Sequence, residues 1–426
     1  MLVTNATLPW LDAADSSAGA AGSPVSPGSV DLRVVDGVFA AIGPSLPREP
    51  GEEVLDAGGR LVLPPFVESH IHLDSVLTAG QPEPNRSGTL FEGIERWAQR
   101  KAFLTVADVK ERVHRVVRQQ AGFGVQFVRT HVDVTDPALT ALTALLELRE
   151  ELAEWVTIQI VAFPQEGICS FPDGRALMER AADLGVDALG AIPHFEFTRE
   201  YAVESLNFVC ALAADRGLLV DVHCDEIDDE ASRGLETLAA RAYELGLGPR
   251  VTASHTTAMH SYNNAYFTRL LRLLTLSGMN FVANPVVNTH LQGRIDSYPK
   301  RRGVTRVKEL SEAGVNVSFG TDDIVDPWNP LGTGNLRDVV HTGLYVTQLL
   351  GHQEITDSYR FVTTNAARTL HLGDGYGLEV GRPASFVLLD AGSWYEALNW
   401  NAPVLASYRR GRLVARTEPV HREVLF

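Results

Sequence analysis

The chain is poor in cysteine. It has only three in 426 residues, Cys169, Cys210 and Cys224, and no two of them form a close pair. This scarcity excludes a disulfide framework and a cysteine-rich zinc site, and it favours a reducing compartment. No apolar run approaches the ~20 residues that a membrane-spanning helix needs. The start of the chain carries Asp12 and Asp15 and lacks the basic residues that open a secretory leader. We therefore expect a cytoplasmic protein.

Positive charge is also scarce. The 37 Lys and Arg residues are outnumbered by 53 Asp and Glu residues, which leaves a formal net charge of -16. An acidic field repels phosphate backbones and anionic lipids, so the charge argues against nucleic acid and membranes as partners. Hydrophobic residues make up 45% of the chain and charged residues 21%. That balance is typical of a packed protein, and it rules out a disordered chain, collagen or a coiled coil.

The two ends of the chain contain short strand-like segments. Val30–Val35 and Val38–Ile42 flank an Asp-Gly pair, which is the pattern of a β-hairpin. Three more such segments lie near the C-terminus: Ala384–Leu389, Val404–Arg409 and Leu413–Ala415. Residues 12–28 are rich in Ala, Ser, Gly and Pro and predict an exposed loop of low complexity.

The middle of the chain alternates between apolar strand-like segments and amphipathic stretches with helical periodicity. The strand-like segments are Leu61–Val67, Val125–His131, Val156–Phe163, Ala188–Pro193, Leu218–His223, Val251–His255, Asn280–Asn284 and Val315–Phe319. Eight such units predict an α/β fold, a (β/α)₈ TIM barrel at residues 60–375, with a small β-sandwich domain built from residues 1–59 and 376–426. A doubly wound sheet is the alternative, but no glycine-rich nucleotide fingerprint follows the first strand.

Polar and titratable residues follow seven of these eight segments at their C-terminal ends. They include His70 and His72 after the first, Gln165 after the third, His223 and Glu226 after the fifth, His255 at the sixth, and Asp322 and Asp323 after the eighth. A barrel brings all strand ends of this kind to one face, where barrel enzymes build their sites. Packing alone does not explain the pattern, because buried polar groups are costly unless they are paired.

His70 and His72 are two residues apart, so in an extended strand both imidazoles project from the same face. Alone, such a pair is typical of solvated loop histidines. Here it recurs with His223 and Asp322 on later strand ends, and imidazole and carboxylate are good ligands for a borderline metal ion. Three histidines and one aspartate leave room for water, as a catalytic metal site requires.

Glu226 lies three residues beyond His223. In a purely structural role, Glu226 would be an acidic residue stabilised by the positive end of a helix dipole at a helix N-terminus. Beside a metal site, a carboxylate that holds and passes a proton is what hydrolysis needs. The neighbours Asp322 and Asp323 are expected to point to opposite sides, one toward the metal and the other toward a substrate or as support behind the site.

Three further side chains suit a flat, neutral heterocycle. Gln165 offers a donor and an acceptor together, which matches an amide-like edge, although it also suits a backbone cap. Phe163 and Trp328 are either core aromatics or apolar walls for a ring. The sequence leaves His131, His194 and His290 unassigned.

Long segments of the chain match a known family. They are 70–74 (HIHLD), 87–97 (SGTLFEGIERW), 160–167 (IVAFPQEG), 191–200 (AIPHFEFTRE), 221–230 (DVHCDEIDDE) and 251–262 (VTASHTTAMHSY). On these segments the chain resembles the bacterial cytosine deaminases of the amidohydrolase superfamily. The resemblance covers nearly the whole chain and implies conversion of cytosine to uracil and ammonia, in pyrimidine salvage.

The resemblance also implies a set of roles for individual residues. It implies one divalent metal ion per chain, Fe(II) or Zn(II), held by His70, His72, His223 and Asp322. It implies that Glu226 carries a proton to the ring and that His255 and Asp322 activate the attacking hydroxide. Substrate contacts would come from Gln165, Asp323, Leu90, Phe163 and Trp328. A homo-oligomer, with a hexamer as the suggested form, is implied as well.

Two departures from the family pattern leave the substrate open. Thr321 stands where the family has histidine, and Val325 stands where it has phenylalanine. A smaller Val325 would widen the pocket and admit a substituted ring. The alternative substrates are 5-methylcytosine, isoguanine, creatinine and a triazine. Two other classes are weighed against the deaminase: a binuclear cyclic-amide hydrolase, which needs a lysine near His194 that the chain lacks, and a non-catalytic scaffold, which would be expected to lose the ligand residues.

Overall fold

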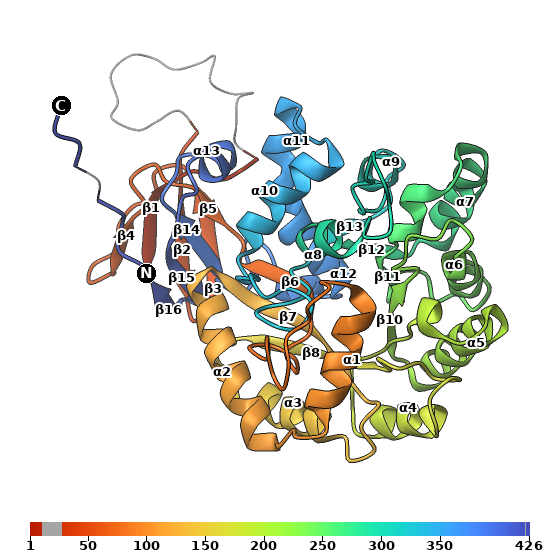
Figure 1. Ribbon diagram of the computed structural model, residues 1–426. Helices are drawn as coiled ribbons and strands as arrows, with labels where there is room; N and C mark the ends of the chain where they lie inside the picture. Colours follow the sequence, from red (N-terminus) through yellow and green to blue (C-terminus); the bar gives the residue numbers. More distant parts are fainter. Residues whose placement is uncertain (11–27, 422) are drawn as a thin grey trace.

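The computed structural model describes residues 1–10, 28–421 and 423–426. An eight-stranded sheet from the middle of the chain forms the centre, and two four-stranded sheets from the chain ends lie together on one side of it (Figure 1). The loop predicted at residues 12–28 lies outside the described residues, apart from Gly28.

The central sheet confirms the predicted barrel. Its strands neighbour one another in chain order and pair in parallel. They are β6 (Phe66–Ile71), β7 (Val125–Asp133), β8 (Thr157–Phe163), β9 (Ala188–Leu189), β10 (Leu219–Cys224), β11 (Val251–His255), β12 (Asn280–Ala283) and β13 (Val317–Phe319). The first and last strands meet just beyond β13. There the Asp322 amide donates to the His70 carbonyl and the His72 amide donates to the Asp322 carbonyl, both at 2.9 Å.

Helices surround the barrel and bury their apolar faces against it. In α2 (Val106–Gly122) the buried residues Val109, Val113, Val116 and Val117 recur at helical spacing. The other helices are α1 (Leu90–Lys101), α3 (Thr140–Glu151), α4 (Gly174–Asp183), α5 (Arg199–Arg216), α6 (Gly234–Glu244), α7 (Asn264–Ser277), α8 (Pro285–Leu291), α9 (Val307–Glu312), α10 (Leu336–Thr347), α11 (His352–Asp357), α12 (Thr364–Thr369) and α13 (Trp394–Asn399). Short 3₁₀ turns are η1 (Pro193–Phe195), η2 (Gly248–Arg250), η3 (Thr257–Ser261), η4 (Ser358–Val362) and η5 (Gly373–Gly375). Across the described residues, every helix is too short or too polar to cross a membrane.

The two sheets at the chain ends share one core. Their strands are β1 (Leu2–Ala6), β2 (Val30–Val35), β3 (Val38–Gly43) and β4 (Val54–Asp56) in one sheet, and β5 (Val62–Leu63), β14 (Phe386–Leu389), β15 (Val404–Arg409) and β16 (Arg412–Arg416) in the other. Apart from the parallel pair β1 and β4, the strands pair antiparallel. Phe39 and Leu32 from one end of the chain pack with Phe386 and Tyr408 from the other. The predicted sandwich of both termini is therefore present.

Two tight turns close β-hairpins, the predicted one between β2 and β3 and a second between β15 and β16. Asp36 and Gly37 have φ values of 48° and 79°, and Arg410 and Gly411 have values of 48° and 75°. Two successive positive φ values define the turn whose twist matches a β-hairpin. A Cβ atom on Gly411 would lie 2.9 Å from Cγ1 of Val34, so glycine also allows the two hairpins to pack closely.

The prediction of the first barrel strand, Leu61–Val67, is wrong in one respect. The segment is two strands in two sheets: Val62–Leu63 pairs with β14 in the C-terminal sheet, and the barrel strand begins only at Phe66. Pro64 and Pro65 separate them, and proline has no amide hydrogen to donate to a ladder. The fourth strand is also shorter than predicted, because η1 begins at Pro193. The domain boundaries at residues 59 and 375 stay a prediction.

Candidate active site

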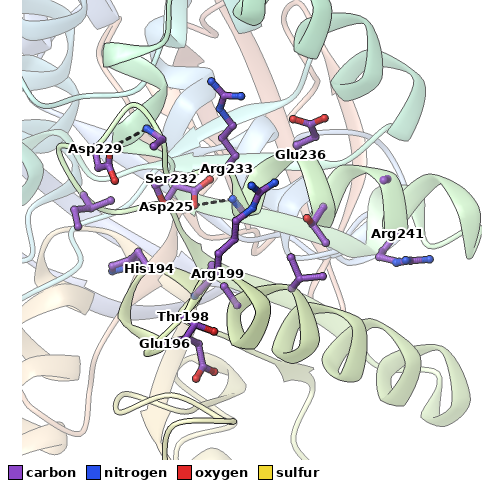
Figure 2. Close-up of a pocket in the computed structure, with 18 of the residues that line it drawn as sticks. His194, Glu196, Thr198, Arg199, Asp225, Asp229, Ser232, Arg233, Glu236 and Arg241 are labelled. Carbon is purple, nitrogen blue, oxygen red and sulfur yellow. Dashed lines mark hydrogen bonds between the residues drawn. The ribbon is translucent and has the colours of Figure 1, made fainter.

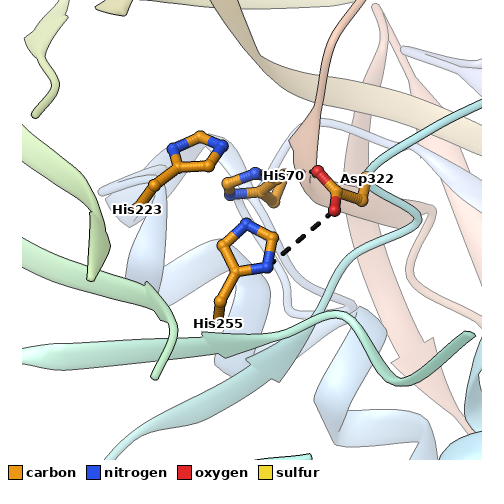
Figure 3. A group of neighbouring side chains, drawn as sticks. All are labelled: His70, His223, His255 and Asp322. Atoms are coloured by element: carbon orange, nitrogen blue, oxygen red, sulfur yellow. Dashed lines mark ion pairs between the residues drawn. The ribbon is translucent and has the colours of Figure 1, made fainter. Parts of the chain in front are cut away.

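Four side chains from separate strand ends meet at the mouth of the barrel. His70 lies on β6, His223 on β10 and His255 on β11, while Asp322 follows β13. One ligand atom from each lies within 4.8 Å of the others, and all four residues are buried. Figure 3 shows the three imidazoles and the carboxylate turned toward one another. The barrel therefore brings together residues that are up to 252 positions apart in the chain.

His72 adds a further imidazole to this group. Its Nε2 atom lies 2.9 Å from Nε2 of His223 and 3.4 Å from Oδ1 of Asp322. Nε2 of His70 lies 3.1 Å from the same carboxylate oxygen. Burial lowers the pKa of both His70 and His223, so both rings are neutral, which is the state that binds a metal ion. Ring nitrogens that face each other beside a carboxylate fit a divalent cation.

A chain of hydrogen bonds behind the cluster orients His70. The Ser254 hydroxyl donates to Oδ1 of Asp221 at 2.7 Å and lies 3.0 Å from Nδ1 of His70. Arg129 donates to the other Asp221 oxygen at 2.8 Å. Because the serine proton is committed to Asp221, its oxygen accepts from Nδ1 and leaves Nε2 of His70 as the free ligand atom. His131, unassigned from the sequence, stacks on the His70 ring at a centroid distance of 3.9 Å.

Glu226 lies beside the cluster in a buried polar unit. Its Oε1 atom accepts a hydrogen bond from Asn288 Nδ2 at 3.0 Å and lies 3.2 Å from Nδ1 of His255. Its amide donates to Nδ1 of His194 at 3.3 Å. Burial lowers the pKa of His255, but the carboxylates of Glu226 and Asp322 outweigh it and raise that pKa to about 9. The unit therefore holds a carboxylate and an imidazole in direct contact.

Sequence reasoning missed Asn288. The seventh strand, β12, ends in the apolar residue Ala283, so its strand end carries no polar group of the expected kind. The polar side chains come later, as Asn284 and Asn288 at a spacing of four around α8 (Pro285–Leu291). Residues four apart share a helix face, and this spacing was the available signal.

A small cavity opens onto the cluster and has an empty volume of about 300 Å³. Its lining consists of His72, Leu90, Gln165, Ile192, His223, Glu226, Leu291, Asp322, Asp323 and Trp328. Gln165, Asp323, Leu90 and Trp328, the predicted substrate contacts, thus border the same space as the cluster. Phe163 does not line it: its buried ring stacks behind His223 at 3.9 Å between centroids.

Asp322 and Asp323 differ from their predicted arrangement. Both line the cavity, whereas alternation along a strand would turn them to opposite sides. Asp322 has a φ of 68°, so the backbone is left-handed at this point and the strand pattern no longer applies. Burial and the neighbouring Asp322 raise the pKa of Asp323, which shares a hydrogen bond with Asp326.

The two departures from the family pattern lie behind the cavity wall. The amide of Thr321 donates to Oε1 of the buried Glu68 at 3.0 Å, and neither Thr321 nor Val325 lines the cavity. Val325 packs against the main core and has a φ of 52°, which is unusual for a β-branched residue. The expectation that a smaller Val325 widens the pocket directly is therefore not met.

A wider cavity, with about 1720 Å³ of empty space including open solvent, is bordered by the η1 residues Pro193 and His194 (Figure 2). Arg199 at the start of α5, Arg233 just before α6 and Asp225 just after β10 border it. The Asp225 carboxylate is engaged internally, since it accepts hydrogen bonds from Ser232 Oγ at 2.7 Å and from the Leu235 amide at 2.8 Å. The metal-ligand cluster lies outside this space, so the smaller cavity is the candidate active site.

A model of the amidohydrolase family matches residues 53–415. The chain belongs to this family, and it is a hydrolase that acts on carbon–nitrogen bonds. The resemblance identified from the sequence motifs is thereby confirmed.

Similar proteins share nearly the whole length of the chain. N-isopropylammelide isopropyl amidohydrolase of Pseudomonas sp. (strain ADP) is 31% identical over 378 residues, which cover 87% of this chain and 89% of the relative. Pterin deaminase of Rhizobium rhizogenes is 28% identical over 401 residues, covering 92% and 90%. The crystal structure of 5-methylcytosine deaminase from Klebsiella pneumoniae liganded with 5-fluorocytosine superposes with a TM-score of 0.94 at 50% identity, covering 100% of this chain and 99% of that one.

Proposed function

We propose that this enzyme hydrolytically deaminates an aminopyrimidine, with cytosine converted to uracil and ammonia. One observation carries the proposal: a buried cluster of imidazoles and a carboxylate lies against Glu226 and opens into a small cavity bordered by Gln165 and Trp328. Metal ligands, a proton carrier and a contact for an amide edge are thereby within reach of one small ring.

The cluster is proposed to hold one divalent ion, Fe(II) or Zn(II), through His70, His72, His223 and Asp322. His255 is kept apart from the ligand set because its Nδ1 atom already contacts Glu226 and Asn288. Such an ion, when bound, makes water a nucleophile at neutral pH.

The protein's own residues would then move protons and orient the ring. His255 and Asp322 would activate the attacking water: Glu226 would take its first proton, and the Asp322 carboxylate, in contact with His255, would take its second. Glu226 would deliver a proton to the ring nitrogen next to the amine-bearing carbon, and that protonation makes the carbon electrophilic. The second proton passes from Asp322 to the amine, and ammonia leaves as the carbon–nitrogen bond breaks and a carbonyl forms.

The remaining cavity residues would select a flat ring. Gln165 would donate a hydrogen bond to the amide-like edge of the ring and accept another from it. Asp323 would contact the side of the ring that faces the metal ligands. Leu90 and Trp328 would cover its apolar faces. The cavity is small, with about 300 Å³ of empty space including open solvent, which favours a single small heterocycle over a nucleoside.

5-Methylcytosine is the second candidate substrate. It is supported by the 50% identity to a protein described as a 5-methylcytosine deaminase, over the whole chain. Ile192 and Leu291 also present apolar side chains to the cavity, and a ring methyl group gains from such a surface.

The test is an ammonia-release assay of the metal-loaded protein on cytosine, 5-methylcytosine, isoguanine, creatinine and an aminotriazine. We expect turnover of cytosine, of 5-methylcytosine or of both, with about one metal ion bound per chain. Release from one of the other rings alone would replace the aminopyrimidine proposal. Two metal ions per chain would support a binuclear cyclic-amide hydrolase instead.

The cytoplasmic location and a homo-oligomeric state, with six copies, belong to this proposal as well. Sedimentation of the purified full chain would measure the oligomeric state.

Gly93→Ala is expected to weaken substrate binding. Gly93 lies on α1 against Trp328, and a Cβ atom there would stand 2.3 Å from Trp328 Nε1. The indole would have to move into the cavity, so we expect KM to rise about tenfold with bound metal unchanged. Gly122→Ala is the matched control, because a Cβ at that helix position meets nothing within 4 Å. Equal KM values in both variants would contradict this view of the Trp328 wall.

A further inference from the structure

One stripe of helix α1 faces the candidate active site. Leu90, Gly93, Trp97 and Lys101 lie three to four residues apart and share a helix face. Leu90 lines the cavity, and its carbonyl accepts a hydrogen bond from Trp328 Nε1 at 3.2 Å. The helix therefore supplies part of the cavity wall through Leu90 and supports another part through Trp328.

Lys101, at the end of this stripe, connects α1 to two strand ends. Its Nζ atom lies 2.8 Å from Asp133 Oδ2, 2.7 Å from Thr135 Oγ1 and 2.7 Å from Glu166 Oε1. An ammonium group has three donors, so all of them are used. Asp133 ends β7, and Glu166 directly follows Gln165, which lines the cavity.

The surroundings of Lys101 shield these contacts from solvent and favour the charged form of the ammonium group. Its side chain is only 9% exposed, and that of Asp133 is 2% exposed. Burial lowers the pKa of Lys101, but Asp133 and Glu166 outweigh it and raise that pKa above its ordinary value. Trp97 Nε1 also donates to Asp133 Oδ2, at 2.9 Å, so two residues of the stripe hold the same carboxylate.

Lys110 provides a comparison within the same chain. It also pairs with two acids, Glu147 and Glu151, but it lies on α2 and its partners are 50% and 46% exposed. Exposed pairs of this kind contribute little to stability or position.

We propose that Lys101 is a positioning residue that holds the α1 wall and the Gln165 segment at the separation a flat ring requires. The inference rests on the proposed function, because Gln165 and Trp328 are assigned to the substrate there. Lys101 lies outside the cavity, so its loss should weaken the fit of the ring and leave the proton transfers intact.

The experiment compares Lys101→Met, Lys101→Arg, Glu166→Gln and Lys110→Met in the metal-loaded full chain. We expect Lys101→Met to raise KM about tenfold while kcat changes less than about threefold. Glu166→Gln removes the negative charge from only one of the contacts, at a partly exposed residue, so it should fold normally and raise KM by a smaller factor. Lys101→Arg should recover part of the loss because it keeps the charge, and Lys110→Met should match the wild type.

Amide hydrogen exchange supplies a readout that needs no turnover. In Lys101→Met and Glu166→Gln, exchange should become faster in residues 90–101 and 164–168 and stay unchanged in α3; in Lys110→Met both segments should match the wild type. Three results for Lys101→Met would each overturn the proposal: an unchanged KM, a fall in kcat at constant KM, or unchanged amide exchange in both segments. If the wild type releases ammonia from none of the rings tested, the proposed function fails, and the exchange data still decide the role of Lys101.

Discussion

Replacing Glu226 by glutamine is expected to lower kcat by about 10²–10⁴-fold, the usual contribution of a general acid–base group. Glutamine keeps the shape of the side chain and its contact with Asn288, but it has no carboxylate to carry a proton. The metal ligands are untouched, so bound metal should equal that of the wild type. Steady-state kinetics of ammonia release together with elemental analysis of the protein would measure both quantities.

Glu230→Gln is the matched control for this experiment, because Glu230 lies four residues further along the same segment and is exposed. It should retain full activity. Full activity in Glu226→Gln would remove Glu226 from the proposed proton transfer. Loss of the metal in that variant would show instead that Glu226 acts through the ligand cluster.

The second large effect is expected from Asp322→Asn, which should abolish activity and release the metal ion. The Asp322 carboxylate lies 3.1 Å from His70, 3.4 Å from His72 and 3.9 Å from His255, so one change removes a charge that these three imidazoles share. An amide is a poorer ligand for a borderline metal than a carboxylate. Metal retained after dialysis against a chelator would measure the loss.

Ser254→Ala is the variant with which the metal loss of Asp322→Asn is compared. Ser254 orients His70 without belonging to the ligand set, and loss of such an outer contact costs about 10–100-fold in metal affinity. Asp322→Asn should therefore lose more metal than Ser254→Ala at every chelator concentration. The reverse order, or wild-type metal content in Asp322→Asn, would contradict the proposed ligand set.

The barrel and the meeting of its polar strand ends were predictable from local patterns. Each strand is a short apolar run, and each is followed by a helical period, so the alternation indicates parallel pairing without any knowledge of contacts. Parallel pairing in a closed barrel then forces His70, His223, His255 and Asp322 to one face, however far apart they lie in the chain. The hairpins at both ends were equally local, because Asp36-Gly37 and Arg410-Gly411 carry their turn signal in the residues themselves.

Other features depend on packing between distant segments, and no local pattern encodes them. Pro64 and Pro65 separate a strand of the terminal sheet from the first strand of the barrel, yet the apolar run around them is continuous in the sequence. The left-handed backbone at Asp322 brings Asp323 into the cavity as well. Asn288 reaches Glu226 from a helix, and Lys101 reaches Asp133 and Glu166 from another.

Residue type and spacing along the chain thus determined the class of fold, the metal-binding chemistry and the general position of the site, because these follow from strand periodicity and the topology of a barrel. The tertiary structure alone decided which side chains touch Glu226, which aromatic rings border the cavity, and which contacts tie α1 to the strand ends. Those contacts join residues across separate elements, and their geometry exists only once the helices have packed against the strand ends.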